Sequence, residues 1–547
     1  MWRSSIHAYL SNLKAHTCPT SLPTFLNRSR LLHRPQNSVD RCRRVHSNKH
    51  FSTHVQGARL YADPHVPTLS DSQRHTIYAL STPPGKAGVA VVRVSGPDAF
   101  LVWKRMVRIR GGKGEYRSPV PWKMERCRII QPEESGEALD DGLAVYFRAP
   151  RSFTKEDVVE LHLHSGRAIV SSVLSALSKL PFCRPAEPGE FTRRAFEAGG
   201  LDLTQVEGLK DLIDAETEGQ RRIALRAAGG IVKAQFDELR SGIIRCLANV
   251  EALIDFGEGE DIEDGVYDHA RLQAQLLLVT IREHLDDKRR GEIIRSGIRL
   301  AIFGPPNAGK SSLLNFFAQR EAAIVTPVPG TTRDILELSL DIGGLPVIVA
   351  DTAGLRKTND IVEIIGIERA NVAVQTANIS LCVLSLPEVL EFASDGPQLR
   401  IPKALKQLIT PNTHFLFNKS DLLKSPISSQ ALCSLTGKPA WTASLTTGEG
   451  LTKFLEGFSV ALQNRLRYDL HEDRPSSQAP LITRARHRIH LESACRFLEA
   501  FLRTSPHDVV LGAEELRYAA QAVGKVSGSI DVEDVLDSVF KDFCIGK

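Results

Sequence analysis

Eight consecutive residues, Gly304 to Ser311, have the types and the spacing that bind nucleotide phosphates. They fit the pattern G-x-x-x-x-G-K-[ST]. The two glycines let the backbone turn its N–H groups toward phosphate oxygens, and a helix start adds partial positive charge. In this pattern Lys310 reaches the β- and γ-phosphates and Ser311 binds Mg²⁺. The residues predicted to bind the nucleotide here are Gly304, Asn307, Ala308, Gly309, Lys310, Ser311 and Ser312.

The flanks of this stretch predict the elements that would hold it. An apolar run, Ile298 to Phe303, precedes the loop and indicates a buried strand. Helix-forming residues with several large apolar side chains follow from Ser312 to Gln319. A chance glycine turn is the alternative, and the agreement of both flanks with a strand–loop–helix unit argues against it.

Two further tetrapeptides indicate which nucleotide binds. Asp351, Thr352, Ala353 and Gly354 follow the apolar run 345–350, so the acid would face Mg²⁺ and the glycine N–H would approach the γ-phosphate. Asn418, Lys419, Ser420 and Asp421 follow the apolar strand 415–417, and the carboxylate can accept both N–H groups of the guanine edge. Each tetrapeptide is weak evidence by itself. The three motifs in this order resemble a GTP-binding domain, although Ser444-Leu445-Thr446 replaces the usual Ser-Ala-Lys and leaves the last guanine contact open.

The length and composition of the chain bound its organisation. It has 547 residues, enough for about three or four domains, of which 42% are hydrophobic and 24% charged, as in globular proteins. No apolar run is long enough for a membrane-spanning helix, so we expect no integral membrane segment. The nine cysteines form no C-x-x-C pair, which argues against a zinc site or a disulfide framework and favours a reducing compartment.

The first sixty residues differ from the rest in charge. They hold ten Lys or Arg and one acid, a net charge of +9, whereas the whole chain carries +5 and the remainder therefore about −4. Ser, Arg and His are frequent and leucines are scattered among the basic residues, a composition typical of a mitochondrial transit segment. The alternative is a retained basic arm that contacts RNA.

The hydrophobic periodicity predicts a multidomain α+β and α/β protein. Strand candidates at 77–80, 88–94, 142–147 and 158–163, with a helix at 166–179, predict a small N-terminal α+β domain. Helical stripes before and after the nucleotide-binding motifs predict an all-α domain into which a P-loop GTPase domain, a mostly parallel sheet with flanking helices, is inserted. The expected segments are a transit segment (1–60), the N-terminal domain (76–195), the first helical half (196–295), the GTP-binding domain (297–462) and the second helical half (466–547).

Several longer motifs resemble the MnmE/TrmE family of tRNA-modification GTPases in its mitochondrial form. The resemblance covers about residues 75–547 and rests on stretches that begin at Thr82, Val92, Pro188, Leu201 and Asp211: TPPG, VRVSG, PGEFTRRAF, LDLTQ and DLIDA. It ends with Phe543 followed by the terminal Cys544-Ile545-Gly546-Lys547.

The resemblance implies a function that the composition and spacing do not. It implies a GTPase that acts with an FAD-dependent MnmG-type partner on carbon 5 of the wobble uridine of mitochondrial tRNAs, in the matrix. It also implies an N-terminal domain that forms a homodimer and binds 5-formyl- or methylene-tetrahydrofolate through Arg93, Glu160 and Lys547. Arg93 and Lys547 could pair with the folate carboxylates, and Glu160 could accept from the pterin N–H groups. A further basic contact of the family falls on Gly200.

GTP hydrolysis requires an oriented water and neutralised charge. Leu355 stands where many GTPases carry the glutamine that orients the water. We therefore expect a cation beside the phosphates, K⁺ by the resemblance, bound by Asn307 and by the loop residues Thr326, Val328 and Thr331, while Thr332 completes the Mg²⁺ shell with Ser311. The resemblance assigns Glu363 to orienting the water; the alternatives are a loop-stabilising Asn307 and a solvated Glu363.

Cys544 is the second catalytic candidate, since the family match makes it a participant in the modification site. A mitochondrial ribosome-assembly GTPase is the alternative function, and it predicts an RNA-binding module such as a KH domain after the nucleotide domain. A signalling switch without an RNA role would have no use for the folate-like N-terminal domain.

Overall fold

The computed structural model describes residues 75–109, 117–133, 136–256, 265–319, 323–326, 337–349, 371–393, 396–423, 425, 427–466, 479–528, 540, 543 and 546. The chain divides into two compact units, Met1–Val66 and Pro67–Lys547, and every described residue belongs to the second. The predicted transit segment lies outside the described residues.

The N-terminal domain is a seven-stranded sheet in the order β3-β4-β5-β6-β2-β1-β7. Its neighbouring strands are antiparallel except for the parallel pair β1 and β7. The strands are β1 (Thr76–Leu80), β2 (Ala90–Ser95), β3 (Val107–Ile109), β4 (Glu125–Ile130), β5 (Ala138–Phe147), β6 (Val158–Leu163) and β7 (Cys183–Pro185). The helices are α1 (Ala99–Met106), α2 (Arg167–Ser178) and α3 (Glu190–Glu197).

The period-two pattern of β2 and β6 separates the two faces of this sheet. Val92 and Val94 of β2 join Leu161 of β6 in a core that also includes residues of α1 and α2. Because successive side chains in a strand point to opposite faces, Arg93 and Glu160 lie on the other face. The sheet thus combines a buried apolar face with a face that carries polar residues.

The helical domain contains segments from both sides of the nucleotide-binding domain. The first half comprises α4 (Leu203–Ile213), α5 (Glu218–Ala228), α6 (Ile231–Phe256), α7 (Val266–Leu285) and α8 (Arg290–Ser296). Helix α4 begins at a capping box of Asp202 and Gln205. The second half contains α15 (Ala485–Arg503) and α16 (Val509–Ser527).

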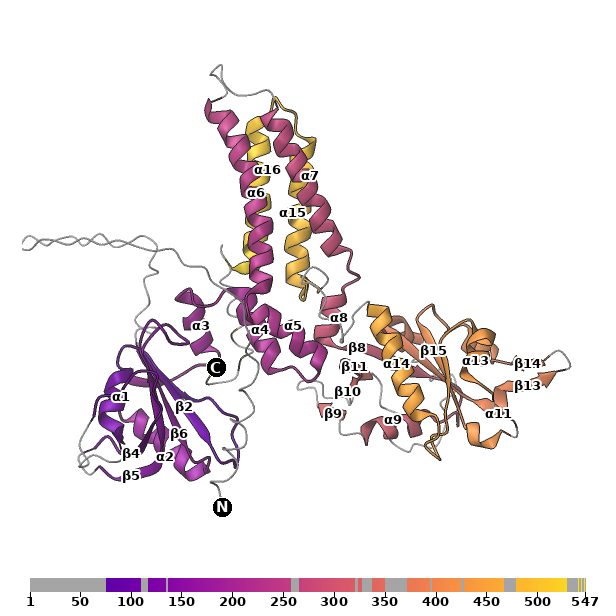
Figure 1. Cartoon of the computed structure of the whole chain (residues 1–547), viewed down its shortest axis with the longest axis horizontal. Helices are drawn as coiled ribbons and strands as arrows, with labels where there is room; N and C mark the ends of the chain where they lie inside the picture. The colour runs from indigo at the N-terminus through magenta and orange to yellow at the C-terminus, as the bar shows by residue number, and fades with distance from the viewer. Residues whose placement is uncertain are drawn as a thin grey trace, which may run out of the picture. The chain divides into compact units, whose positions relative to one another are not determined.

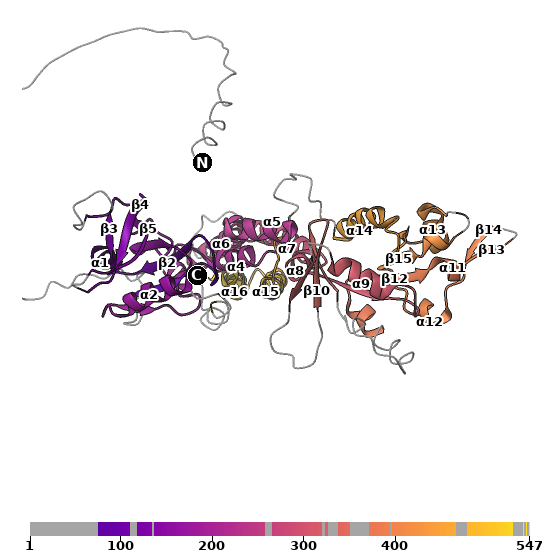
Figure 2. The same ribbon diagram turned by 90° about the horizontal axis from the view of Figure 1, so that it is seen from below.

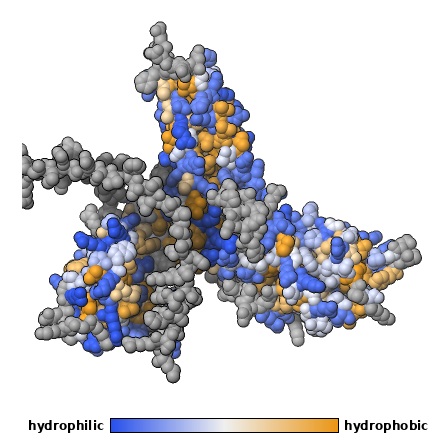
Figure 3. Space-filling view, viewed as in Figure 1, coloured by the Kyte–Doolittle hydropathy of each residue, from blue (hydrophilic) through white to orange (hydrophobic). Residues whose placement is uncertain are grey.

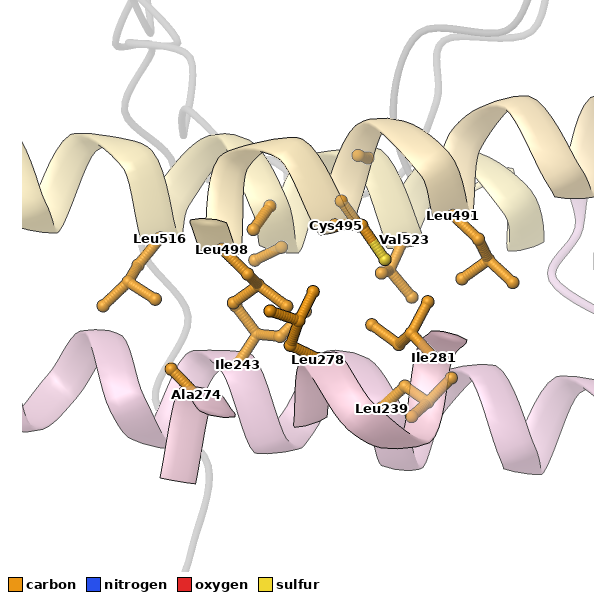
Figure 4. Packing of buried hydrophobic residues seen from close by; sticks show 14 of the residues in the cluster. Leu239, Ile243, Ala274, Leu278, Ile281, Leu491, Cys495, Leu498, Leu516 and Val523 are labelled. Atoms are coloured by element: carbon orange, nitrogen blue, oxygen red, sulfur yellow. The ribbon is translucent and has the colours of Figure 1, made fainter. Parts of the chain in front are cut away.

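Helices α6, α7, α15 and α16 lie side by side as a bundle (Figure 1). The apolar stripe of each helix faces the others: Leu239 and Ile243 of α6 share one core with Leu498 of α15 and Leu516 of α16 (Figure 4). The prediction that the two helical halves pack together around an inserted domain is therefore confirmed.

The inserted domain is a seven-stranded sheet in the order β16-β15-β12-β8-β11-β10-β9. The five strands from β16 to β11 are parallel, and β10 and β9 continue the sheet antiparallel. The strands are β8 (Ile298–Phe303), β9 (Ala323–Thr326), β10 (Glu337–Ile342), β11 (Leu345–Val349), β12 (Ile379–Ser385), β15 (Thr413–Asn418) and β16 (Ala440–Thr442). A separate hairpin consists of β13 (Leu390–Ala393) and β14 (Gly396–Leu399).

Helices lie on either side of this sheet (Figure 2). One core contains Leu300 of β8 with residues of α9 (Lys310–Ala318) and α14 (Leu451–Leu466), and a second contains Ala301 with residues of α12 (Lys403–Lys406) and α13 (Ser429–Thr436). The remaining short elements are α11 (Leu386–Val389) and the 3₁₀ helix η2 (Ser420–Leu422). The predicted fold class, with a mostly parallel sheet in the inserted domain, is confirmed.

The visible surface mixes hydrophilic and hydrophobic residues (Figure 3). Among the described residues, no helix combines the length and the apolar character needed to cross a membrane.

Candidate functional sites

The glycine loop connects β8 to α9, as the sequence predicts. Strand β8 spans Ile298–Phe303, and α9 begins at Lys310, two residues before the predicted helix start. Gly309 caps the helix with φ +104°, a conformation that favours glycine. A Cβ at this position would lie 2.1 Å from Nδ2 of Asn418, so the close approach of another loop also requires glycine.

Asn418 joins the glycine loop to the Leu445 loop, on the side where the sequence predicts the guanine contacts. It ends β15 and is buried, its Nδ2 donates to the carbonyl of Ala308 at 2.9 Å, and its Oδ1 accepts from the N–H of Leu445 at 3.0 Å. The described residues of two of the three predicted motifs therefore meet at the carboxyl ends of parallel strands, where open α/β sheets bind their ligands.

Lys310 lies over the loop that it follows in sequence. Its Nζ donates to the carbonyls of Gly304 and Pro305 at 2.9 and 2.7 Å, and burial lowers the pKa of the amine. Ser311 and Ser312 are exposed in the first turn of α9, next to helix N–H groups that have no partner within the helix. The N–H groups at this end of α9 can thus donate hydrogen bonds to phosphate oxygens. The Ser311 hydroxyl is accessible to a divalent cation.

Asn307 lies in the loop with φ +61° and is exposed. Asparagine tolerates this left-handed conformation better than most residues. The backbone around Asn307 therefore has the tight turn that phosphate binding requires, and its side chain is accessible to a ligand.

Lys419 and Asp421 follow Asn418 at the start of η2. Lys419 has φ +64°, and its Nζ lies 3.3 Å from Oε1 of Glu388 in α11. The nearby Ser385 hydroxyl and the Lys419 ammonium lower the pKa of Glu388. Asp421 is exposed and therefore accessible to a base. The sequence does not predict the contact of Glu388 with Lys419, because no local pattern connects α11 with residues more than thirty positions away.

The loop Ser444-Leu445-Thr446 keeps the backbone contacts of the site despite its side chains. The hydroxyl of Ser444 accepts from the N–H of Thr447 at 3.1 Å, and Leu445 packs half-buried against the core of the nucleotide domain. The loop is therefore shaped by bonds in which Ser444 Oγ and Asn418 Oδ1 accept from backbone N–H groups, and these bonds do not depend on the side chain of Leu445.

Several predicted site residues lie outside the described residues. They are Val328, Thr331, Thr332, Asp351, Thr352, Ala353, Gly354, Leu355, Glu363, Cys544 and Lys547, and of Thr326 only the backbone is described.

In the N-terminal domain, Arg93 and Glu160 are direct partners across β2 and β6. Arg93 Nε and Nη2 lie 3.0 and 2.9 Å from Glu160 Oε1. Burial alone would raise the pKa of Glu160, but His162 and Arg93 together hold it below its ordinary value. Because Arg93 is engaged with Glu160, this arginine orients the carboxylate in addition to any contact it makes with a ligand.

Aromatic side chains surround this ion pair. The Arg93 guanidinium lies 5.3 Å from the ring centroid of Phe153 and 5.7 Å from that of Phe191. Such cation–π contacts attract the guanidinium to the ring faces. The described residues thus form a fixed charged pair beside Phe153, which is 37% exposed.

Gly546, within the terminal motif, contacts the N-terminal domain. Its carbonyl accepts from the Ser81 hydroxyl at 2.9 Å. It has φ +97°, and a Cβ at this position would lie 2.1 Å from the carbonyl oxygen of Leu80. Ser81 directly follows β1, and its N–H donates to Val91 of β2 at 2.7 Å.

Gly200, where the family has a further basic folate contact, has no side chain to make it. A Cβ at this position would lie 2.9 Å from Cε of Lys155.

Comparisons with known proteins agree with this architecture. A sequence model of the GTP-binding protein TrmE N-terminus matches residues 76–200, and a model of the MnmE helical domain matches residues 203–544. The chain belongs to the MnmE/TrmE family.

Relatives in this family match most of the chain. The mitochondrial 5-taurinomethyluridine-[tRNA] synthase subunit GTPB3 of Danio rerio is 45% identical over 480 residues, covering 86% of this chain and 93% of the relative. The tRNA modification GTPase MnmE of Parvibaculum lavamentivorans is 45% identical over 477 residues, covering 86% of this chain and 100% of the relative. The GTPB3 subunit of Homo sapiens is 41% identical over 482 residues, covering 86% of this chain and 93% of the relative.

Proposed function

We propose that the chain is a GTP-hydrolysing enzyme that acts with an FAD-dependent MnmG-type partner to modify carbon 5 of the wobble uridine in mitochondrial tRNAs. The observation that carries the proposal is the nucleotide site, where Asn418 bonds the glycine loop and the Leu445 loop together, in a chain whose relatives are named as tRNA-modifying GTPases. The chemistry at this site is transfer of the γ-phosphoryl group of GTP to water.

The residues of the nucleotide site fit GTP, Mg²⁺ and K⁺. Lys310 and the N–H groups at the start of α9 neutralise phosphate charge, and Asp421 accepts from the guanine edge. Ser311 and Thr332 would bind Mg²⁺; Asn307 with Thr326, Val328 and Thr331 would bind K⁺. The two cations supply positive charge against the phosphates as the transition state forms, and Glu363 would orient the water.

A folate site in the N-terminal domain is the second part of the proposal. The carboxylate of Glu160, held ionised beside Arg93, is an acceptor for the N–H groups of a pterin. The contact of Gly546 with Ser81 supports placing the terminal motif, with Cys544 and Lys547, near this sheet.

We also propose that the N-terminal domain forms a homodimer. Val120, Trp122 and Met124, directly before β4, and Leu143 of β5 are large apolar residues with exposures of 43%, 56%, 48% and 39%. Exposed apolar groups of this kind mark interaction surfaces, and the family expectation favours a second copy of the chain. Light scattering should report a dimer in the wild type and a shift toward monomer in Trp122→Ala.

The proposed compartment is the mitochondrial matrix. The basic, acid-poor residues 1–60 support it, as does the word mitochondrial in the names of the animal relatives. The proposed segments are a transit segment (1–60), the N-terminal domain (76–195), the first helical half (196–295), the GTP-binding domain (297–462) and the second helical half (466–547). The ribosome-assembly alternative has less support, because residues 479–528 contain helices of the bundle and no strand of a KH-type module.

One experiment tests the proposal as a whole. Mitochondrial tRNA from cells lacking the protein is digested to nucleosides and analysed by mass spectrometry, beside cells that carry the wild-type chain or Lys310→Ala. We expect the modified wobble uridine to disappear without the protein and with Lys310→Ala. Unchanged nucleosides with defective ribosomes would favour the assembly factor instead.

A further inference from the structure

We infer that His162 is a ligand-binding residue of the one-carbon site, where it donates a hydrogen bond to a ring carbonyl of the pterin beside Glu160. This rests on the proposed folate site, and it adds a residue and a specific edge of the ligand to it.

The sheet register places His162 next to the Arg93–Glu160 pair. His162 lies opposite Val91 in β2 and Leu143 in β5. It is two positions along the strand from Glu160, which lies opposite Arg93. Residues two apart in a strand share a face, so Glu160 and His162 share the face opposite the apolar core. The side chain of His162 is 20% exposed, so the ring is mostly enclosed.

The hydrogen bonding of this pair is incomplete. Arg93 occupies Oε1 of Glu160, while Oε2 lies 3.7 Å from Nε2 of His162, beyond a normal hydrogen bond. Nε2 of His162 is buried and has no hydrogen-bond partner within the described part of the chain. Buried polar atoms in native proteins nearly always have a partner, so an unpaired one adjacent to an accessible carboxylate indicates a ligand that supplies it.

The hydrogen-bonding groups of Glu160 and His162 indicate which groups the ligand presents to them. The carboxylate is an acceptor and an imidazole N–H is a donor. Side by side they match a planar heterocycle that presents an N–H group next to a carbonyl, as the pterin ring does. Phe153 offers an apolar surface for such a ring, and its contact with Arg93 keeps the charged group in place.

His164, two residues after His162 and directly after the end of β6, provides a matched control. It is 65% exposed, and its Nδ1 lies 2.8 Å from Oδ1 of Asp140, whose other oxygen accepts from the His164 N–H. These partners of His164 all lie on Asp140, and none of them is part of the Arg93–Glu160 pair.

The test is calorimetric titration of the full-length chain with 5-formyltetrahydrofolate. We expect His162→Leu to weaken binding about tenfold or more, because the ring carbonyl would be left without its donor. His162→Gln should recover most of the affinity, since its amide also offers an N–H group. His164→Leu should bind like the wild type, and thermal melting should report equal stability for all variants.

The outcomes separate the two proposals. Wild-type affinity in His162→Leu, together with lost binding in Glu160→Gln, would keep the folate site and overturn the role of His162. Equal losses in His162→Leu and His162→Gln with a lower melting temperature would show a structural role and also overturn it. A wild-type chain that binds no folate would overturn the folate site and this inference with it.

Discussion

The side chain of Asn418 is hydrogen-bonded to Ala308 on one side and to Leu445 on the other. One buried amide thus fixes the distance between the glycine loop and the Leu445 loop. Both bonds use backbone groups as partners, so they are independent of the side chains at positions 308 and 445. This explains why Leu445, in place of the usual alanine, is compatible with the site.

Asn418→Ala should weaken GTP binding by about 10- to 100-fold. The substitution leaves a buried carbonyl and a buried N–H without partners, at a cost of about 1–3 kcal/mol. Fluorescence titration with a labelled guanine nucleotide measures the change. Asn315→Ala on the exposed side of α9 is the matched control and should bind like the wild type. Equal affinities for Asn418→Ala and the control would contradict the bridging role.

The sequence predicted much of the nucleotide site because its signals are local. The apolar run of β8, the glycine pattern and the helix formers of α9 adjoin one another in the chain, and β8 has the predicted bounds. The helices of the bundle were also predicted, since apolar residues that recur with a 3.6-residue period indicate a helix with one buried face.

What the sequence did not predict depends on contacts between distant residues. Arg93 meets Glu160 only because antiparallel register brings together residues 67 positions apart. The hairpin of β13 and β14 is four residues a strand and includes Pro397, so it has no clear strand pattern. The roles of Glu388 and His162 depend on residues that are close in space but distant in the chain. Such contacts leave no periodic pattern in a single sequence.

Asp421→Asn should change the base preference from guanine toward xanthine. The carboxylate accepts two N–H bonds from guanine, whereas an amide offers one donor and one acceptor, which suits a base with a carbonyl at that edge. Competition between GTP and XTP for the labelled nucleotide measures the ratio of affinities. An undiminished preference for GTP would show that Asp421 does not contact the base.

GTP turnover should be much faster in K⁺ than in Na⁺ at equal ionic strength. The reason is Leu355 in the position of the usual water-orienting glutamine, together with Asn307 in the glycine loop, the residue proposed to bind K⁺. Turnover is measured by phosphate release in the two salts, and Asn307→Ala should remove the difference between them. Equal turnover of the wild type in both salts would exclude the cation mechanism.

Glu207 in α4 should stabilise the helical domain in a pH-dependent manner. Its carboxylate is 4% exposed and lies 2.9 Å from His487 Nε2 and 3.1 Å from Arg486 Nη2. Burial would raise its pKa, but His487, Arg486 and Arg484 lower the pKa to about 2. A depressed carboxyl pKa contributes stability above the unfolded value, about 4.5, and this stability is lost as the pH falls toward 2.

Glu207→Gln should therefore lower the melting temperature at pH 7, with a loss of about 3–5 kcal/mol typical of a broken buried pair. The difference from the wild type should shrink as the pH falls below about 4.5. Glu499→Gln is the control, since Glu499 pairs with Arg282 on the surface of the same bundle and should matter little. Differential scanning calorimetry distinguishes the two; similar small shifts in both variants would contradict the role of Glu207.

Cys544→Ser should abolish tRNA modification and leave GTP binding and hydrolysis unchanged. The carbonyl of Gly546, two residues further along, accepts a hydrogen bond from the Ser81 hydroxyl of the N-terminal domain. The N–H of Ser81 donates to Val91 of β2, and Val91 lies opposite His162 of β6. A thiol becomes a nucleophile at neutral pH far more readily than a hydroxyl does. The measurement is the modified-uridine content of cells that carry only the Ser variant, with the protein level determined in parallel.

Cys183→Ser, at a half-buried cysteine of β7, is the control and should retain modification. Normal modification by Cys544→Ser at normal abundance would exclude this cysteine from the chemistry, and a loss of modification together with a loss of protein in both variants would instead indicate a packing role for the thiols.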